Sequence, residues 1–239
     1  MAKVALITGG ATRLGRSISQ HLASSGWDLA LHYGTSKQAA ETVIEELQKF
    51  YPNQQFFAFQ VDFNDIVKTQ VLIKSVIEQF ECLDLLINNA SVFEPGSLCE
   101  TSAELLVRQT MVNYMAPFIL MRDYANQATH GQIINISDTR IANNGFEHLS
   151  YSISKKSLWE LTKIAALELA PHFRVNAIAP GAILPPPGKD LKYLAEVASK
   201  TPMKIPSGVL PILKSIDYIL DNQDLTGQLL FCDGGAHLL

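Results

Sequence analysis

The chain has 239 residues, enough for one α/β domain with a large core, and its 47% hydrophobic content suits a sheet buried on both faces. A net charge of −4, a pI near 5.9 and the lack of a basic stripe argue against a nucleic-acid partner. No apolar run approaches the roughly 20 residues that cross a bilayer, and the first residues lead into a predicted strand rather than a signal peptide. Cys82, Cys99 and Cys232 lack metal-ligand spacing, so we expect reduced thiols, no metal and a cytoplasmic protein.

Seven apolar, strand-like runs alternate with segments of helical periodicity. Strands are predicted at 4–7, 29–32, 56–61, 83–87, 132–136, 174–178 and 228–231, and helices at 14–24, 37–50, 65–80, 102–126, 151–170 and 208–221. This alternation predicts a single Rossmann-like α/β domain over 1–239, with helices on both faces of a doubly wound parallel sheet. From the order of the predicted elements, we expect about residues 1–130 to bind the cofactor. About residues 131–239 would then carry the catalytic residues and the substrate loop. The stretch from Pro180 to about Ser207 is predicted to be an irregular lid over the substrate.

A glycine-rich turn joins the first predicted strand to the first predicted helix. Gly9 and Gly15 bound this turn, and Arg13 and Leu14 lie between them. Glycines in this context let backbone approach a pyrophosphate, and the helix N-terminus offers N–H donors to it. The turn therefore predicts a dinucleotide site. The alternative is an ordinary loop whose glycines only supply positive φ.

The residues at the end of the second predicted strand indicate which nicotinamide dinucleotide binds. A carboxylate there would hold the ribose hydroxyls and repel a 2′-phosphate. This stretch has no acid, and it offers His32, Tyr33, Thr35 and Ser36, followed by Lys37. Hydroxyls, a histidine and a lysine at a helix N-terminus suit a phosphate, so the sequence favours NADPH. The alternative is that Thr35 and Ser36 only cap the second helix.

The second half of the chain carries groups suited to proton transfer. Asp138 follows the fifth predicted strand, and Tyr151 and Lys155 share one helix face at i, i+4 spacing. A phenol with a pKa near 10 is a weak acid–base group at neutral pH, and we expect the lysine cation to lower that pKa. The pair therefore predicts a tuned proton donor. Asp138 by itself could instead cap a turn.

Together these motifs resemble the short-chain dehydrogenase/reductase family over essentially the whole chain. The matching positions are Thr8, Gly9, Gly15, 88–90, Asn113, Tyr151, Lys155, Pro180, Gly181 and 233–235. The resemblance implies that Asp62, beside Phe63, receives the adenine amino group. It also implies that Asn89, Ala90 and Ser91 lie beside the cofactor, as do the residues Pro180 and Gly181.

The resemblance also implies roles for the second half of the chain. Lys155 would hold the nicotinamide ribose, and Asn113 would support Lys155 through a water molecule. The family is usually tetrameric, so a homotetramer built through the helices at 102–126 and 151–170 is expected. An ordinary buried amide is the alternative for Asn113.

Three departures from the family pattern point to one class of substrate. Arg13 stands at the usual middle glycine of the phosphate loop, Phe93 follows Ser91 closely, and Asp138 replaces the catalytic serine. With these residues the chain resembles the pteridine reductases and, more distantly, the bacterial dihydromonapterin reductases. That resemblance implies a pterin slot made by Arg13, Ser91, Phe93, Asp138 and Tyr151. Chemistry agrees, because a carboxylic acid can relay a proton to the nitrogen of a C=N bond.

We therefore expect NADPH-dependent reduction of a dihydropterin or dihydrofolate to the tetrahydro form, with oxidised pterins as further candidate substrates. One alternative is a carbonyl reductase of the 3-oxoacyl thioester type, in which Asp138 only imitates serine. A second is a catalytically inactive nucleotide-binding regulator. The intact Tyr151 and Lys155 pair argues against the regulator.

Overall fold

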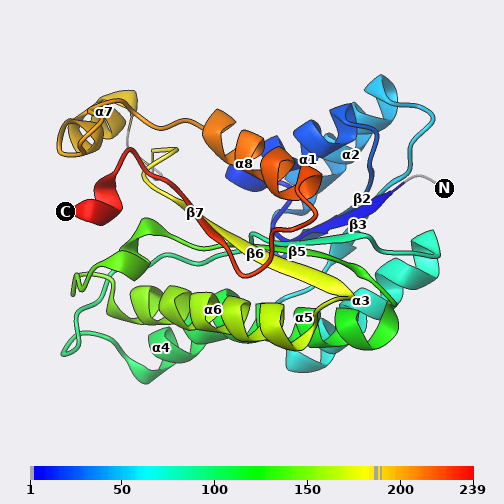
Figure 1. Cartoon of the computed structure of the whole chain (residues 1–239), viewed down its shortest axis with the longest axis horizontal. Helices are drawn as coiled ribbons and strands as arrows, with labels where there is room; N and C mark the ends of the chain where they lie inside the picture. The colour runs from blue at the N-terminus through cyan, green and yellow to red at the C-terminus, as the bar shows by residue number, and fades with distance from the viewer. Residues whose placement is uncertain (1–2, 186–187, 189) are drawn as a thin grey trace.

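Seven parallel strands form one sheet in the computed structural model, which describes residues 3–185, 188 and 190–239. The strands are β1 (Val4–Ile7), β2 (Asp28–Tyr33), β3 (Phe56–Gln60), β4 (Leu85–Asn88), β5 (Gly131–Ile136), β6 (Phe173–Pro180) and β7 (Leu229–Cys232). Their order across the sheet is β3-β2-β1-β4-β5-β6-β7, and Figure 1 shows this sheet between two layers of helices. This order confirms the predicted doubly wound, Rossmann-like fold, and its topological switch point lies between β1 and β4.

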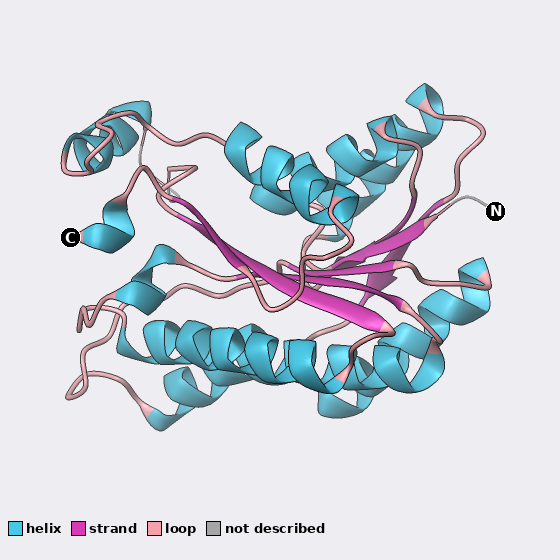
Figure 2. Ribbon diagram, in the orientation of Figure 1, coloured by secondary structure: helices cyan, strands magenta, loops and turns pink. Residues whose placement is uncertain are grey.

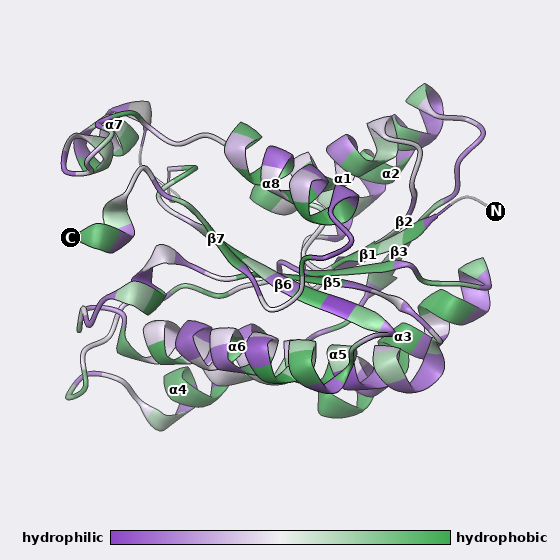
Figure 3. Ribbon diagram, in the orientation of Figure 1, coloured by the Kyte–Doolittle hydropathy of each residue, from purple (hydrophilic) through white to green (hydrophobic). Residues whose placement is uncertain are grey.

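Helices cover both faces of this sheet (Figure 2). On one face lie α1 (Arg13–Ser24), α2 (Lys37–Phe50) and α8 (Leu210–Asp221), and on the other α3 (Ile66–Phe80), α4 (Ala103–Thr110), α5 (Ala116–Gln127) and α6 (Leu149–Glu168). Every residue of β1, β2 and β4 is buried, which is why continuous apolar runs marked these strands in the sequence. Hydrophobic residues accordingly concentrate on the strands and the inward helix faces (Figure 3).

Helices α4 and α6 also expose apolar side chains, among them Val107, Ile164 and Leu167. The homotetramer is expected to form through these helices, and it stays a prediction. No helix in the described ranges is both long enough and apolar enough to cross a membrane.

A π-helical turn interrupts the single helix that the sequence predicts over 102–126. The structure has α4, a π-helix at Met111–Met115 and then α5. Asn113 lies in this turn, fully buried, and its side-chain amide bonds both the N–H and the C=O of Val92 at 2.9 Å. π-helical turns within α-helices are frequent at functional sites. This one anchors the segment that leaves β4 for the site.

The predicted irregular lid contains a helix, so that part of the prediction is wrong. Helix α7 (Leu191–Ser199) begins at Asp190, whose carboxylate accepts from the backbone N–H groups of Lys192 and Tyr193. Leu194 and Ala198 then bury one face of the helix at i, i+4 spacing. The run of prolines before Asp190 obscured this short amphipathic pattern. Residues 186, 187 and 189 lie outside the described residues.

His32, at the end of β2, has a structural role that differs from its predicted one. Its Nδ1 accepts from the N–H of Gly9 at 3.1 Å, so Nε2 carries the proton and donates to the Val61 carbonyl at 2.9 Å. The ring also stacks on Phe63, with centroids 4.1 Å apart. Burial lowers the pKa of His32 to about 4, although the bond to Val61 opposes this. His32 is therefore a neutral brace between three segments, not the expected cation for a phosphate.

This burial predicts a specific loss of stability in acid. Because His32 is neutral when folded and titrates near its ordinary pKa of 6.5 when unfolded, its contribution is complete above pH 6.5 and is lost as the pH falls towards about 4. A shift of this size corresponds to about 3 kcal/mol. Urea unfolding at pH 7 and pH 4.5 should show a smaller pH-dependent loss for His32→Gln than for wild type, while other acidic groups affect both proteins alike. Equal losses in the two proteins would contradict the neutral, buried state of His32.

Candidate active site

A cleft of about 880 Å³ opens at the carboxyl ends of the strands. Its lining includes most of the predicted site residues: Gly9, Arg13, Leu14, Gly15, His32, Thr35, Ser36, Asp62, Phe63, Asn89, Ala90, Ser91, Phe93, Asp138, Tyr151, Lys155, Pro180 and Gly181. Tyr33 and Asn113 are not in its described lining; Tyr33 is buried in β2. Ligands of open α/β sheets bind in this position, outside the carboxyl ends of the strands.

Bare backbone forms the cleft wall where β1 turns into α1. A side chain at Gly15 would place its Cβ 2.0 Å from the Gly9 carbonyl oxygen, so only glycine fits. Helix α1 begins directly beside it, with no side-chain cap from Thr12 and no acid in its first turn. Free N–H groups and the positive end of the helix dipole therefore face the cleft, an arrangement that suits a pyrophosphate.

Polar residues after β4 hold this turn in place. The Asn89 amide nitrogen donates to the Thr8 carbonyl at 2.8 Å, and the Thr8 hydroxyl accepts from the N–H groups of Asn89 and Ala90 at 2.9 Å. These bonds join the ends of β1 and β4 across the switch point. Asn89 therefore orients the turn through its own side chain.

The loop between β2 and α2 presents two side-chain hydroxyl groups to the solvent. Thr35 and Ser36 are exposed, and Ser36 occupies the N-cap position of α2 without a side-chain hydrogen bond to the helix. Side-chain capping by Ser36, the alternative raised by the sequence, is therefore not what this structure contains. Asp62 is also exposed in the cleft, where its carboxylate accepts from the backbone and side chain of Asn64.

Asp138 and Tyr151 meet directly in the cleft. The Tyr151 hydroxyl donates a 2.8 Å hydrogen bond to Asp138 Oδ2, and the N–H of Arg140 donates to Asp138 Oδ1 at 2.8 Å. β5 ends two residues before Asp138, and α6 begins two residues before Tyr151. The sheet edge thus brings together two groups that lie thirteen positions apart in the sequence. Asp138 does cap the turn at 139–142, and it bonds the tyrosine as well.

The expected lowering of the Tyr151 pKa is wrong. Burial, and then the charge and hydrogen bond of Asp138, raise the pKa of Tyr151 well above its ordinary value, against smaller opposing effects of Arg140 and Ser91. The Lys155 ammonium lies 5.8 Å from the centre of the Tyr151 ring, farther than the carboxylate is from the hydroxyl. Tyr151 therefore keeps its proton at neutral pH, and its role as a proton donor stays a prediction.

Lys155 is almost fully buried and keeps donors for a ligand. Its ammonium donates to the Ile136 carbonyl at 2.8 Å, which occupies one of three N–H groups. Burial lowers the pKa of Lys155 to about 8, although the charge of Asp138 opposes this. At neutral pH the group is mainly an ammonium. The water-mediated support from Asn113 stays a prediction, because the Asn113 side chain bonds Ser91, Val92 and Ser154.

Phe93 stands beside the catalytic pair, with nearly half of its surface exposed. Its ring meets the Tyr151 ring edge-on at 4.7 Å and stacks on His148 at 4.0 Å. The Arg140 guanidinium lies 5.0 Å from the ring centre. Part of the aromatic surface is thus already covered by protein, and stacking on a substrate stays a prediction.

Arg13 reaches from the phosphate turn to the loop after β6. Its guanidinium donates to the Pro185 carbonyl at 3.0 Å and to the Leu184 carbonyl at 3.5 Å. The Arg13 backbone has φ of +51°, a left-handed conformation that costs a non-glycine residue about 1–2 kcal/mol. The guanidinium contacts the loop after β6 in this structure, and a role of Arg13 in binding a substrate stays a prediction.

The cleft also contains residues that sequence reasoning missed. They are Thr12, Ser137, Thr139, Arg140, Asn143, Tyr193, Val197, Thr201, Asp233 and Ala236. Ser137 is the most informative, since its hydroxyl is buried without a partner among the described residues, and such groups are usually satisfied by a ligand or water. For Tyr193 and Val197 a signal existed, namely the amphipathic spacing after the capping residue Asp190.

Comparisons with known proteins agree with this geometry. The family described as short chain dehydrogenase matches residues 3–192. The 3-oxoacyl-[acyl-carrier-protein] reductase FabG of Staphylococcus aureus (strain Mu50 / ATCC 700699) is 29% identical and aligns over all of this chain and 99% of its own. The dihydromonapterin reductase of Shigella boydii serotype 4 is 26% identical, over 98% and 96% respectively.

Two solved structures extend the comparison. FolM Alternative dihydrofolate reductase 1 from Brucella canis, complexed with NADP, has a TM-score of 0.91 at 31% identity, covering 99% of this chain and 95% of that one. The protein of the same name from Brucella suis, also with NADP, has a TM-score of 0.90 at 31% identity, covering 99% and 96%. The chain therefore belongs to the short-chain dehydrogenase/reductase family of NAD(P)-dependent oxidoreductases.

Proposed function

We propose that this protein uses NADPH to reduce the C=N bond of a dihydropterin or dihydrofolate. The observation that carries the proposal is the 2.8 Å hydrogen bond between the Tyr151 hydroxyl and the Asp138 carboxylate. A carbonyl oxygen receives its one proton from the tyrosine, and a neutral serine suffices beside it. A ring nitrogen must receive a proton, and a carboxylic acid bonded to the phenol supplies one.

The proton path follows from the chain's own groups. With Asp138 ionised, the phenol donates to the carboxylate. With Asp138 protonated the bond reverses, so Asp138 donates to the Tyr151 oxygen and Tyr151 releases its own proton to the substrate nitrogen. Burial favours a concerted exchange, in which the solvent-derived proton of Asp138 replaces the one that Tyr151 releases, because a free tyrosinate is costly in a buried site. Lys155 places a positive charge under the site and offers N–H donors to a ribose.

Several features of the cleft fit NADPH, which supplies a hydride when it is bound. The uncapped N-terminus of α1 suits the pyrophosphate, and the Thr35 and Ser36 hydroxyls suit a 2′-phosphate. The Ser137 hydroxyl, which is buried and has no partner in the part of the chain that the structure describes, marks a position that a ligand would satisfy. Both Brucella relatives are described as NADP complexes, which supports the same choice.

A 3-oxoacyl thioester reductase is the second candidate. Its support is the FabG relative, which is as similar in sequence as the pterin-reducing relatives and aligns over the full chain. Tyr151 and Lys155 would serve that reaction equally well. Asp138 weighs against it, because Tyr151 can deliver the one proton that a ketone oxygen needs without a carboxylate, and an ionised carboxylate close by would repel the developing alkoxide.

One substrate panel separates the candidates. NADPH oxidation should be followed with dihydrobiopterin, dihydromonapterin, dihydrofolate and an acetoacetyl thioester, each over a range of concentrations. We expect turnover of at least one dihydropterin or dihydrofolate, with a kcat/KM well above that for the thioester. Reduction of the thioester alone would replace the proposed function by the second candidate.

A negative charge added in the loop after β2 tests the predicted preference for NADPH. Wild type is expected to prefer NADPH to NADH in kcat/KM. Thr35→Asp should weaken NADPH use at least tenfold, since a carboxylate near a phosphate repels it by more than about 1 kcal/mol. Thr35→Asn has the same shape without the charge and should lose much less. A wild-type preference for NADH would overturn the assignment.

The proton path is tested at its two ends. Tyr151→Phe removes a single oxygen, so the protein should fold and bind NADPH while kcat falls roughly 100- to 10,000-fold. Asp138→Ala, and to a smaller extent Asp138→Ser, should lower dihydropterin kcat with little change in the NADPH Kd. An Asp138→Ala enzyme with wild-type kcat would rule out the carboxylate as a proton donor.

A further inference from the structure

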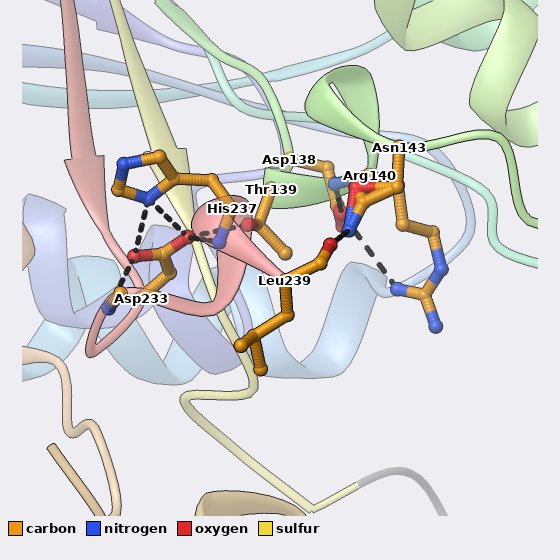
Figure 4. Close-up of polar contacts among 8 residues, drawn as sticks. Asp138, Thr139, Arg140, Asn143, Asp233, His237 and Leu239 are labelled. Carbon is orange, nitrogen blue, oxygen red and sulfur yellow. Dashed lines mark hydrogen bonds and ion pairs between the residues drawn. The ribbon is translucent and has the colours of Figure 1, made fainter. Parts of the chain in front are cut away.

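A buried carboxylate lies behind the catalytic pair, at the end of β7. Asp233 is 4% exposed, and its oxygens accept from the N–H of Gly235 and the N–H of His237, both at 2.9 Å. The His237 ring nitrogen Nδ1 lies 3.0 Å from both oxygens, and the Thr139 hydroxyl donates to Oδ2 (Figure 4). Burying a charge is costly unless it is fully hydrogen-bonded, and here four donor groups satisfy it.

Thr139 connects this carboxylate to the catalytic residue beside it in the sequence. The short 3-10 turn of residues 139–142 begins after Asp138, which caps it by accepting from the N–H of Arg140. That cap restrains the Asp138 side chain relative to its own turn only. Tyr151 bonds the Asp138 side chain itself, and the Thr139 bond to Asp233 adds a tie from the start of the turn to the end of β7.

The C-terminal residues contact the same turn at its other end. His237 stacks on Phe231 of β7 with ring centroids 4.0 Å apart, and the Leu239 carbonyl accepts from the Asn143 amide at 3.5 Å. The turn at 139–142 is thus held at its start through Thr139 and just after its end through Asn143 (Figure 4). On the other side of Asp233, a Cβ at Gly181 would come within 2.9 Å of the Asp233 backbone, so β6 and β7 meet closely here.

We propose that Asp233 is a positioning residue which, through Thr139, holds Asp138 at hydrogen-bond distance from Tyr151. The role rests on the proposed function, because it matters only if Asp138 takes part in proton delivery. A displacement of about 1 Å at a reacting group can cost 100-fold in rate. The bond from Tyr151 to Asp138, at 2.8 Å, leaves no room for a displacement of that size.

The test removes the link without removing either catalytic group. Thr139→Val keeps the shape of the side chain and loses the hydroxyl, whereas Thr139→Ser keeps the hydroxyl. We expect Thr139→Val to lower kcat roughly 10- to 100-fold, and Thr139→Ser to restore most of that loss. The NADPH Kd should change by less than about threefold, because the phosphate turn and Lys155 lie on other elements.

Two further readouts separate positioning from a general structural defect. The solvent deuterium isotope effect on kcat should rise in Thr139→Val, since proton transfer becomes the slower step. Asp233→Asn removes the charge and one acceptor from the same link, and its effect should not add to that of Thr139→Val in the double variant. If Thr139→Val does not fold, Asp233→Asn alone carries the test with the same measurements.

The outcomes distinguish this inference from the proposed function. If Asp138→Ala lowers kcat while Thr139→Val does not, or if Thr139→Val and Thr139→Ser lose equally, the positioning role is wrong and the proton path stands. If Asp138→Ala leaves kcat unchanged, the proton path is wrong and the positioning role falls with it. If the panel shows thioester reduction only, the same variants are measured on the thioester, and a wild-type kcat in Thr139→Val overturns the inference.

Discussion

The chemistry that we propose for this protein depends on one hydrogen bond, from the phenol of Tyr151 to the carboxylate of Asp138. Burial and the neighbouring negative charge both raise the pKa of Tyr151, so the phenol stays protonated at neutral pH. A protonated phenol can donate a proton, and the proposed path has it do so in step with proton return from Asp138. Lys155, below it, contributes positive charge and donors without competing for the carboxylate.

The surrounding fold holds that hydrogen bond and the glycine-rich turn after β1 in fixed positions. Two side chains hold the end of β1 and the turn after it, since His32 of β2 bonds Gly9 and Asn89, which follows β4, bonds the Thr8 carbonyl. A neutral histidine suits this position, because a buried imidazolium would be costly and would lose its acceptor nitrogen. Behind the catalytic pair, Asp233 performs the comparable task for the turn that carries Asp138.

The relatives of this chain divide between acyl thioester and pterin chemistry at similar identity, so overall similarity does not choose the substrate. Local chemistry discriminates better. Arg13 has a left-handed backbone conformation that is strained for arginine and unstrained for glycine. Asp138 places a carboxylate next to the hydroxyl proton of Tyr151. Both features are consistent with a nitrogen heterocycle and are unnecessary for a ketone.

The sequence by itself determined the sheet, the glycine turn and the helix face that Tyr151 and Lys155 share. These are local features, since strands buried on both faces appear as apolar runs, and the tyrosine and lysine lie one helical turn apart. Only the tertiary structure decided the electrostatics. The sequence suggested His32 as a phosphate ligand, whereas the structure buries it as a neutral side chain that links neighbouring segments. The pKa of Tyr151 is raised rather than lowered. It also revealed the link from Thr139 to Asp233, between residues 94 positions apart. Burial and long-range pairing set these properties, and neither is encoded in the spacing of neighbouring residues.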